Sequence, residues 1–125
     1  MLALTQPSRG FSAPVDIFFK SSKLAKVMNE EAKLKKEFGA KNGKEIRLRL
    51  AVLAAASTLA DVPRVPPDRC HQLSGKYKDC FAVDGEHPHR LVFTPAHDPL
   101  PRKPDGGLDL QKITAVTILE VVDYH

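Results

Sequence analysis

Hydrophobic and polar residues follow two different periods along the chain, first that of helices and then that of strands. Residues 15–19 form a short, mostly apolar run that is typical of a strand. Apolar side chains then recur at helical spacing. This predicts a helix over residues 21–38 with Ser21 or Ser22 as its N-cap, and a second helix over residues 42–57. The short link between the two helices predicts an antiparallel hairpin.

The second half of the chain has the pattern of strands separated by turns. A proline-rich connector ends the helical region, and period-two patterns follow at residues 70–73, 79–84 and 89–94. Residues 95–112 contain four prolines and two glycines and have no periodicity, which predicts a long loop that is either a basic flap or a tolerated insertion. Residues 113–122 form the most hydrophobic strand, and we expect it inside the sheet.

These elements predict an α+β fold in the order β-α-α-β-β-β-β. The N-terminal strand and the helical hairpin would pack on a small, mainly antiparallel sheet. We expect residues 15–125 to form one domain, because this length suits a single modest core. Residues 1–14 are rich in Pro, Gly and Ser and are predicted to be a flexible N-terminal extension.

The composition is that of an ordinary globular protein, with 42% hydrophobic and 27% charged residues among 125. No apolar run approaches the ~20 residues needed to cross a membrane, and the N-terminus lacks the features of a signal peptide. We therefore expect a cytoplasmic protein with no membrane partner. Cys70 and Cys80 lack zinc spacing, so we expect two free, buried thiols and neither a metal site nor another cofactor.

Positive charge is concentrated in the helical region. The net charge is +4 and the pI is near 9.2, but residues 20–49 alone carry ten lysines and arginines against four glutamates, an excess of six. A local excess of this size favours attraction to a polyanion. The alternative is a solvated helix face, which is the more common meaning of a charge run.

Five side chains in the strand region have the chemistry of a site that cleaves RNA. Metal-independent cleavage requires a base near the 2′-hydroxyl, a cation on the phosphate and an acid for the departing 5′-oxygen. His71 and His125 can each act as base or acid, and Arg90 can bind phosphate through its planar fork. Strand alternation would place Asp123 and His125 on one face of the sheet and Tyr124 on the other. Taken singly, each residue is also compatible with a structural role.

The motifs that contain these residues resemble those of a toxin family. The chain reads His71-Gln72-Leu73-Ser74-Gly75, then Pro88-His89-Arg90-Leu91-Val92-Phe93, and ends in Val121-Val122-Asp123-Tyr124-His125. These segments resemble the His-x-Leu-x-Gly and Pro-x-Arg-Leu-x-Phe motifs and the C-terminal Asp-Tyr-His of HigB-type plasmid-maintenance toxins, within the RelE/ParE superfamily. The resemblance covers residues 15–125 in the same element order.

This resemblance implies a RelE-like fold with a sheet like that of microbial RNases. It implies a toxin of a type II toxin-antitoxin system, acting as a ribosome-dependent endoribonuclease that cleaves mRNA in the ribosomal A site. The implied partners are a HigA-type helix-turn-helix antitoxin, the ribosome, and operator DNA bound through the antitoxin complex. The family's active-site positions match His71, Arg90, Asp123, Tyr124 and His125.

Two positions depart from the family pattern. Ser74 stands where a lysine often precedes the glycine of the turn, and Gly85 stands where a second basic residue often precedes the arginine strand. The candidates to bind RNA phosphates in their place, together with Arg90, are Arg69, Lys76 and Lys78.

Three alternatives remain open on the sequence. The ParE branch shares the implied fold but poisons DNA gyrase and lacks the catalytic set, so His71 together with the terminal Asp123-Tyr124-His125 argues against it. A degenerate, non-catalytic toxin would act as an antitoxin- and DNA-binding partner, and the two missing basic residues favour it. A zinc protein is disfavoured by the loop context of its only candidate ligands, His87, His89 and His97.

Overall fold

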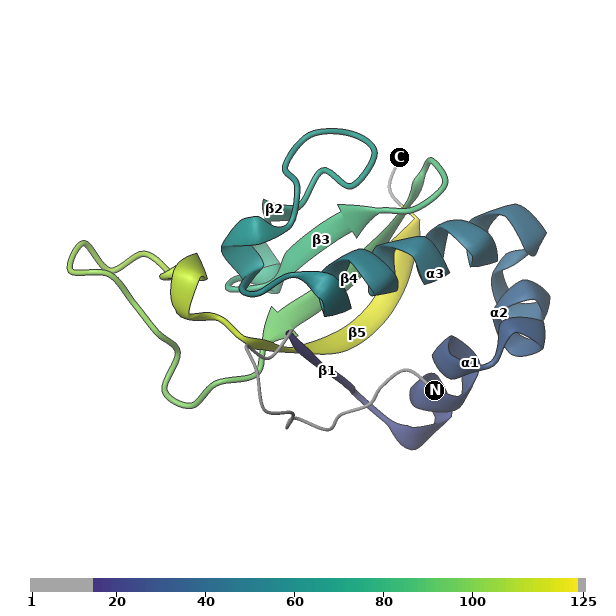
Figure 1. Ribbon diagram of the computed structural model, residues 1–125, viewed down its shortest axis with the longest axis horizontal. Helices are drawn as coiled ribbons and strands as arrows, with labels where there is room; N and C mark the ends of the chain where they lie inside the picture. Colours follow the sequence, from purple (N-terminus) through teal and green to yellow (C-terminus); the bar gives the residue numbers. More distant parts are fainter. Residues whose placement is uncertain (1–14, 124–125) are drawn as a thin grey trace.

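The division into a helical half and a strand half is present in the computed structural model, which describes residues 15–123 (Figure 1). Within these residues the fold is α+β, with three helices and a five-stranded mixed sheet. The helices are α1 (Ser22–Asn29), α2 (Glu31–Phe38) and α3 (Ala40–Ala55). The strands are β1 (Asp16–Phe19), β2 (His71–Gln72), β3 (Phe81–Asp84), β4 (His89–Pro95) and β5 (Ala115–Asp123). Short 3₁₀ turns are η1 (Leu59–Asp61), η2 (Gly75–Tyr77) and η3 (Leu110–Lys112).

The prediction of one helix over residues 21–38 is wrong, because the chain breaks into α1 and α2. Ser21 caps α1 as expected, its hydroxyl accepting the N–H of Leu24 at 3.1 Å. Glu30 then adopts an extended conformation between the helices. Met28 and Leu34 are both buried, although in an unbroken helix two side chains six residues apart would point about 120° apart. The break therefore allows both side chains to reach the core.

The second predicted helix is confirmed as α3, which begins and ends within two residues of the expected bounds. Gly39 (φ 89°) joins it directly to α2, so the link is shorter than expected. Gly43 allows these helices to approach closely, because a Cβ atom there would lie 3.3 Å from the backbone of Leu34. The helical region thus forms the expected hairpin, with α1 as an additional segment.

The sheet has the order β1-β5-β4-β3-β2, and the strands expected from the sequence all appear in it. β5 lies between β1 and β4, which confirms its predicted interior position. Four strands form an antiparallel meander, and β1 pairs with β5 in parallel. A bulge interrupts the β4–β5 register where Val92 pairs with Glu120 and Phe93 with Ile118.

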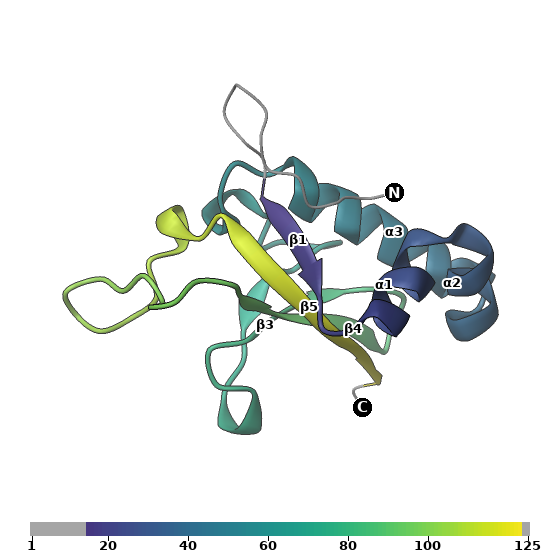
Figure 2. The same cartoon turned by 90° about the horizontal axis from the view of Figure 1, so that it is seen from below.

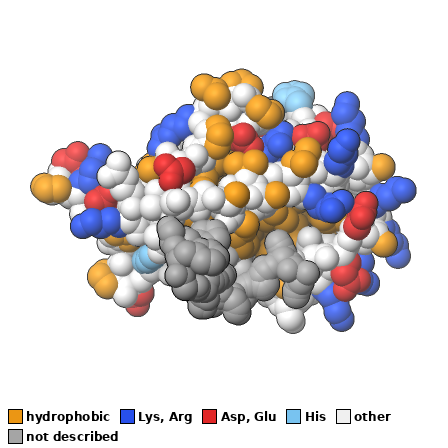
Figure 3. All heavy atoms as spheres, viewed as in Figure 1, with side chains coloured by type: hydrophobic (Ala, Val, Ile, Leu, Met, Phe, Trp, Pro, Cys, Tyr) orange, Lys and Arg blue, Asp and Glu red, His pale blue; other side chains and the backbone are white. Residues whose placement is uncertain are grey.

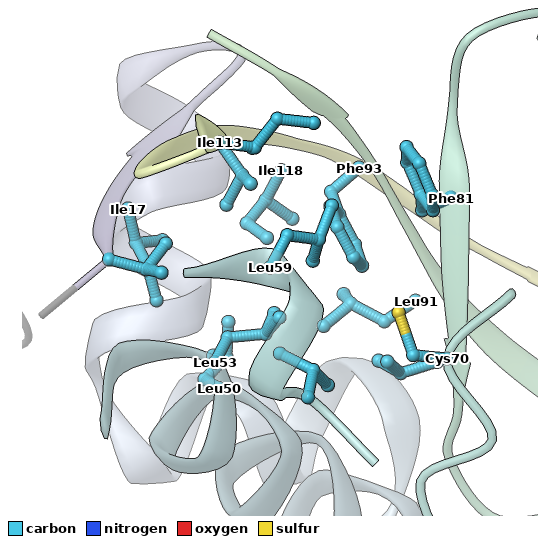
Figure 4. Close-up of a cluster of buried hydrophobic side chains, with 14 of the residues drawn as sticks. Ile17, Leu50, Leu53, Leu59, Cys70, Phe81, Leu91, Phe93, Ile113 and Ile118 are labelled. Atoms are coloured by element: carbon cyan, nitrogen blue, oxygen red, sulfur yellow. The ribbon is translucent and has the colours of Figure 1, made fainter. Parts of the chain in front are cut away.

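One face of the sheet is covered by α3 and buries the main core (Figure 4). Phe81 and Phe93 stack with ring centroids 6.0 Å apart on this face. The labelled side chains converge from α3, the connector and the strands. The largest fully buried members are Phe81, Phe93, Leu34, Ile46, Leu53, Leu59, Leu91, Ile113 and Ile118.

The opposite face carries no α-helix of residues 15–123. Figure 2 shows α3 on one side of the sheet, whereas the loop that contains η2 projects beyond the other side. We call this second side the open face. Cys70 packs in the main core, whereas Cys80 belongs to a small apolar cluster on the open face. Both thiols are free and buried, as predicted.

The segment after β4 is a long loop, as predicted, and it projects from the sheet (Figure 1). Two contacts hold this loop against the rest of the fold. Arg102 donates to the carboxylate of Asp79 at 3.2 Å, and Leu108 is buried in the main core. Its basic residue Arg102 is therefore paired. None of the helices between residues 15 and 123 combines the length and apolarity required to cross a membrane. The predicted extension at residues 1–14 lies outside the described residues.

Candidate functional site on the open face of the sheet

Strand register decides which polar side chains share the open face. Residues paired across neighbouring strands point to the same side, and alternate residues point to opposite sides. Leu91 and Val83 pair and lie in the core, so their neighbours Arg90 and Asp84 point to the open face. Two rows result: one consists of His71, Ala82, Val92 and Glu120, and the next of Asp84, Arg90 and Val122.

Two arginines converge on one carboxylate in the second row. Arg69 donates from Nε to one oxygen of Asp84 at 2.6 Å and from Nη2 to the other at 3.4 Å. Nε of Arg90 lies 3.5 Å from the same carboxylate. The hydrogen bond that Arg69 donates to the Asp84 carboxylate, together with the negative charge of that carboxylate, raises the pKa of Arg69. Two cations against one anion leave this cluster with a formal charge of +1.

The backbone at Arg69 is strained. Its φ angle is 44°, in the left-handed region that non-glycine residues rarely adopt. Two hydrogen bonds hold this segment: the N–H of Arg69 donates to the carbonyl of Val65, and the N–H of Asp84 donates to the carbonyl of Asp68. Such strain occurs often at functional sites, where surrounding structure maintains it. Here it directs the guanidinium of Arg69 to Asp84.

A buried arginine on α3 supports the cluster from the other side. Arg49 donates from Nε to the backbone carbonyl of Asp84 at 2.8 Å and from Nη2 to Glu45 at 2.8 Å. The carboxylate of Asp68 lies 3.6 Å from the same Nε. Arg49 is 6% exposed and Asp68 is 6% exposed. Arg49 was counted with the basic surface from the sequence, but its position makes it a buried connection between α3 and β3.

His71 has a defined tautomer, because its Nδ1 lies 2.7 Å from the backbone carbonyl of Arg69. A carbonyl oxygen only accepts hydrogen bonds, so Nδ1 carries a proton and donates. In the neutral ring, Nε2 then holds the lone pair and can accept a proton. His71 and Arg90 lie two strands and one row apart, which corresponds to roughly 12 Å between their Cα atoms.

A small pocket of about 60 Å³ lies where the Asp84 cluster meets the β3–β4 turn. It is lined by Arg69, Asp84, His87, Pro88, His89 and Arg90. His87 and His89 had been considered from the sequence only as zinc ligands. Their signal was available in the run His87-Pro88-His89-Arg90, which brings two imidazoles next to the arginine strand. Within residues 15–123 no group of three His, Cys, Asp or Glu side chains is placed to hold a metal ion.

The third histidine of the zinc alternative, His97, does not line this pocket and has its own contact. Nε2 of His97 accepts the N–H of Thr114 at 3.0 Å, which ties the long loop to the start of β5. His89 has a local contact as well, since its Nδ1 lies 3.2 Å from the carbonyl of Glu86 within the turn.

Lys76, Tyr77 and Lys78 lie on the loop that projects at the open face. The hydroxyl of Tyr77 donates to the carboxylate of Glu120 at 2.7 Å, which places the ring above the first row. The ammonium of Lys76 lies 5.3 Å from the centroid of this ring. Lys76 and Lys78 are exposed, as expected of phosphate-binding candidates.

The terminal tripeptide is only partly within the described residues. Asp123 pairs with His89 on β4, and alternation puts this pair on the side of Leu91 and Val121, opposite to Arg90. The register therefore separates Asp123 from His71 and Arg90. Tyr124 and His125, the other two predicted site residues, lie outside the described residues.

Gly85, one of the two departures from the toxin pattern, has a steric reason. A Cβ atom at this position would lie 2.9 Å from Oδ1 of Asn42, which accepts the N–H of Glu86 at 3.0 Å. A basic side chain at residue 85 would therefore require this buried contact to move. Ser74, the other departure, is exposed at the start of the η2 loop, and nothing in the structure explains the missing lysine.

The lysine-rich helices form a separate basic surface. Figure 3 shows lysines and arginines gathered over α1, α2 and the start of α3, on the side of the molecule that the helices occupy. The exposed members are Lys20, Lys23, Lys26, Lys33, Lys35, Lys36, Lys41, Lys44 and Arg47. Arg47 pairs with Glu31 at 3.3 Å and Lys41 with Glu86 at 3.4 Å, which leaves most of the positive charge unneutralised by these bridges.

Comparisons with known protein families, with curated protein sequences and with solved structures found no match.

Proposed function

We propose that the chain is a HigB-type toxin that cleaves mRNA on the ribosome. The observation that carries this proposal is the position of His71 on the same open sheet face as Arg69 and Arg90, with its Nδ1 proton donated to a carbonyl. An imidazole with its Nε2 available to accept a proton and a pair of guanidinium groups on the same face are two of the three parts that RNA cleavage requires. The toxin motifs described above supply the family and the ribosome dependence.

In the proposed reaction, Nε2 of His71 removes the proton of a 2′-hydroxyl. The 2′-oxygen then attacks the adjacent phosphorus, and the bond from phosphorus to the 5′-oxygen breaks. The products are a 2′,3′-cyclic phosphate and a 5′-hydroxyl. Arg90 and Arg69 would stabilise the charge that develops on the phosphate oxygens. The departing 5′-oxygen needs a proton, and in this proposal the terminal Asp123-Tyr124-His125 segment supplies it.

The partners of this proposal come from the basic helical surface and from the family resemblance. The basic helical surface would contact ribosomal RNA, for which positive charge is the general requirement. The ribosome would position the mRNA, so a small enzyme with few catalytic groups can suffice. A HigA-type helix-turn-helix antitoxin would inhibit the toxin, and the complex would bind operator DNA.

A second candidate function is a non-catalytic toxin that acts only as a binding partner of an antitoxin and DNA. Two observations favour it. Asp84 already pairs with both Arg69 and Arg90, and Asp123 lies on the opposite face of the sheet from His71. In this alternative the Arg69–Asp84–Arg90 cluster stabilises the sheet edge and does not bind phosphate.

Cleavage assays on Arg90→Ala separate these functions. We expect purified protein to cleave mRNA in a ribosome-dependent manner, and we expect Arg90→Ala to lower the rate about 100-fold, because a donor to the developing charge is lost. Arg102→Ala is the matched control, since Arg102 also pairs with an aspartate but comes from the loop after β4 and is not part of the Asp84 cluster. Primer extension would map the mRNA 5′ ends with and without ribosomes.

The outcomes are distinct. Equal cleavage by Arg90→Ala and Arg102→Ala would remove Arg90 from phosphate binding. No cleavage by the native chain, together with tight binding of a helix-turn-helix antitoxin, would support the binding-partner function. Inhibition of DNA supercoiling by gyrase would instead indicate the ParE activity. The same cleavage assay on a chain without His125 tests the role assigned to the terminal tripeptide.

A further inference from the structure

We propose that Tyr77 is a stacking platform for one nucleobase of single-stranded RNA bound across the open face. This inference rests on the proposed function, in that RNA is the substrate, and it adds a contact that the toxin motifs do not assign. It concerns how the substrate is held and involves no step of the cleavage reaction.

The open face has a small apolar area next to its charged row. Cys80, Ala82 and Val92 are buried there and form a cluster separate from the main core. The partly buried side chains packed against this cluster are Leu73, Tyr77, Leu119 and Val122. Tyr77 is the only aromatic residue in this set. An aromatic ring on an apolar sheet surface is the usual structural basis for stacking unpaired bases.

The position of the Tyr77 ring is fixed by contacts at several points. The turn that carries it begins at Gly75 (φ 65°) and is followed by Asp79 (φ 65°), two left-handed positions that direct the loop. The Tyr77 hydroxyl is held by Glu120 on β5, 43 residues later in the chain. A ring that is fixed before binding loses little conformational entropy when a base stacks on it.

In this proposal the base stacks on the ring face over which Lys76 lies. The ammonium of Lys76 lies over the ring at 5.3 Å from its centroid, and Lys76 is itself exposed. A flexible, hydrated ammonium on an aromatic face is readily displaced, because such exposed contacts contribute only about 0.5–1 kcal/mol. The displaced lysine would then lie close to the phosphate of the stacked nucleotide.

The charges around the platform identify the occupant as a polyanion with planar groups. Lys76 and Lys78 lie on the platform's own loop. Arg90 lies in the adjacent row, and Arg69 pairs with the Asp84 of that row. The carboxylates near the platform are already paired: Asp84 and Glu120 accept hydrogen bonds from Arg69 and Tyr77, and Asp79 accepts one from Arg102. Single-stranded RNA combines phosphates for the cations with unpaired bases for the ring, whereas a duplex does not expose its bases in this way.

The platform is close to the proposed reaction site but separate from it. Glu120 pairs with Val92, and Val122 pairs with Arg90, so the two rows are two residues or about 7 Å apart along the strands. A base stacked on Tyr77 would therefore belong to a nucleotide next to the one whose phosphate Arg90 contacts. The contact would set which nucleotide is presented for cleavage.

The test compares Tyr77→Leu with Tyr77→Phe. Both variants lose the hydrogen bond to Glu120, and only Tyr77→Leu loses the ring. The probe is a fluorescently labelled 2′-O-methyl RNA hexamer, which cannot be cleaved because its 2′-oxygen is blocked. At low salt we expect Tyr77→Phe to bind within about 2-fold of the native chain and Tyr77→Leu to bind about 5-fold or more weakly, since base–aromatic stacking is lost. Fluorescence anisotropy measures the dissociation constants.

An abasic hexamer of the same length, with phosphates but no bases, is the matched control. It should bind equally to the native chain, Tyr77→Phe and Tyr77→Leu. Equal affinity of the two variants for the 2′-O-methyl hexamer would overturn the inference, as would an equal loss on the abasic hexamer or no binding of either probe. Thermal unfolding of the variants checks the fold. Ring-dependent binding without cleavage on ribosomes would contradict the proposed function and leave the platform intact.

Discussion

The two faces of the same sheet differ in what their side chains do. On the face covered by α3, Val83, Leu91 and Phe93 are buried in a continuous core. On the open face, the residues that alternate with them include Asp84 and Arg90, with Tyr77 and its loop alongside. A substitution on one face should therefore change mainly the stability, and a substitution on the other should change mainly binding. This separation allows the same strands to provide both a core and a candidate site.

The largest expected effect comes from one substitution made on each face. Leu91→Ala should lower the free energy of unfolding by about 4 kcal/mol, because it removes a fully buried side chain and leaves a cavity. Leu119→Ala, on the open face and partly exposed, should lower it by only about 1 kcal/mol. Urea unfolding with a common m-value measures both. Equal losses would mean that the open face is packed as tightly as the covered one.

The pattern of apolar residues was sufficient to predict every strand and the interior position of β5. It was insufficient for the break at Glu30, because Met28 and Leu34 appear compatible with one helical stripe until their angular separation is calculated. It was also insufficient for the parallel pairing of β1 with β5, since pairing partners are determined by tertiary packing, which period-two patterns do not encode.

The site was predictable to the extent that it depends on local motif and strand alternation. His71 and Arg90 were predicted as functional residues, and the register places both on the open face. The role of Asp84 could not be predicted, because it depends on the left-handed backbone of Arg69 and on the length of the β3–β4 turn. The separation of Asp123 from these residues depends on whether the end of β5 stays regular, and after the bulge the register is regular from Glu120 through Asp123.

A second comparison concerns two arginines on α3, two residues apart. Arg49→Met should lower the free energy of unfolding by about 3 kcal/mol, because Asp68 would remain buried without its partner. Arg47→Met, at an exposed pair with Glu31, should change it by less than about 0.5 kcal/mol. Chemical denaturation measures both values. Arg49 also donates to the backbone carbonyl of Asp84. Its substitution should therefore also disturb the Arg69–Asp84–Arg90 cluster on the open face.

A double substitution distinguishes loss of the charge pair from loss of packing. If the cost of Arg49→Met arises from the unpaired carboxylate, Arg49→Met combined with Asp68→Asn should be more stable than Arg49→Met alone. Additive losses would indicate that packing of the arginine stem, and not the buried charge, supports the connection between α3 and β3.

The smallest expected effect concerns the cysteine on the covered face and its dependence on pH. Burial raises the pKa of the Cys70 thiol to about 11. Below pH 9 the thiol is protonated in both the folded and unfolded states. Between about pH 9 and 11 only the unfolded state releases this proton, so the free energy of unfolding falls as the pH rises, by about 1.4 kcal/mol at pH 10.

Cys70→Ala removes this contribution while other groups titrate as before. The difference in unfolding free energy between the native chain and Cys70→Ala, measured at pH 8 and pH 10, should therefore shrink by about this amount. A difference that is independent of pH would show that the Cys70 thiol titrates equally in both states, and that the covered face does not exclude water at this position.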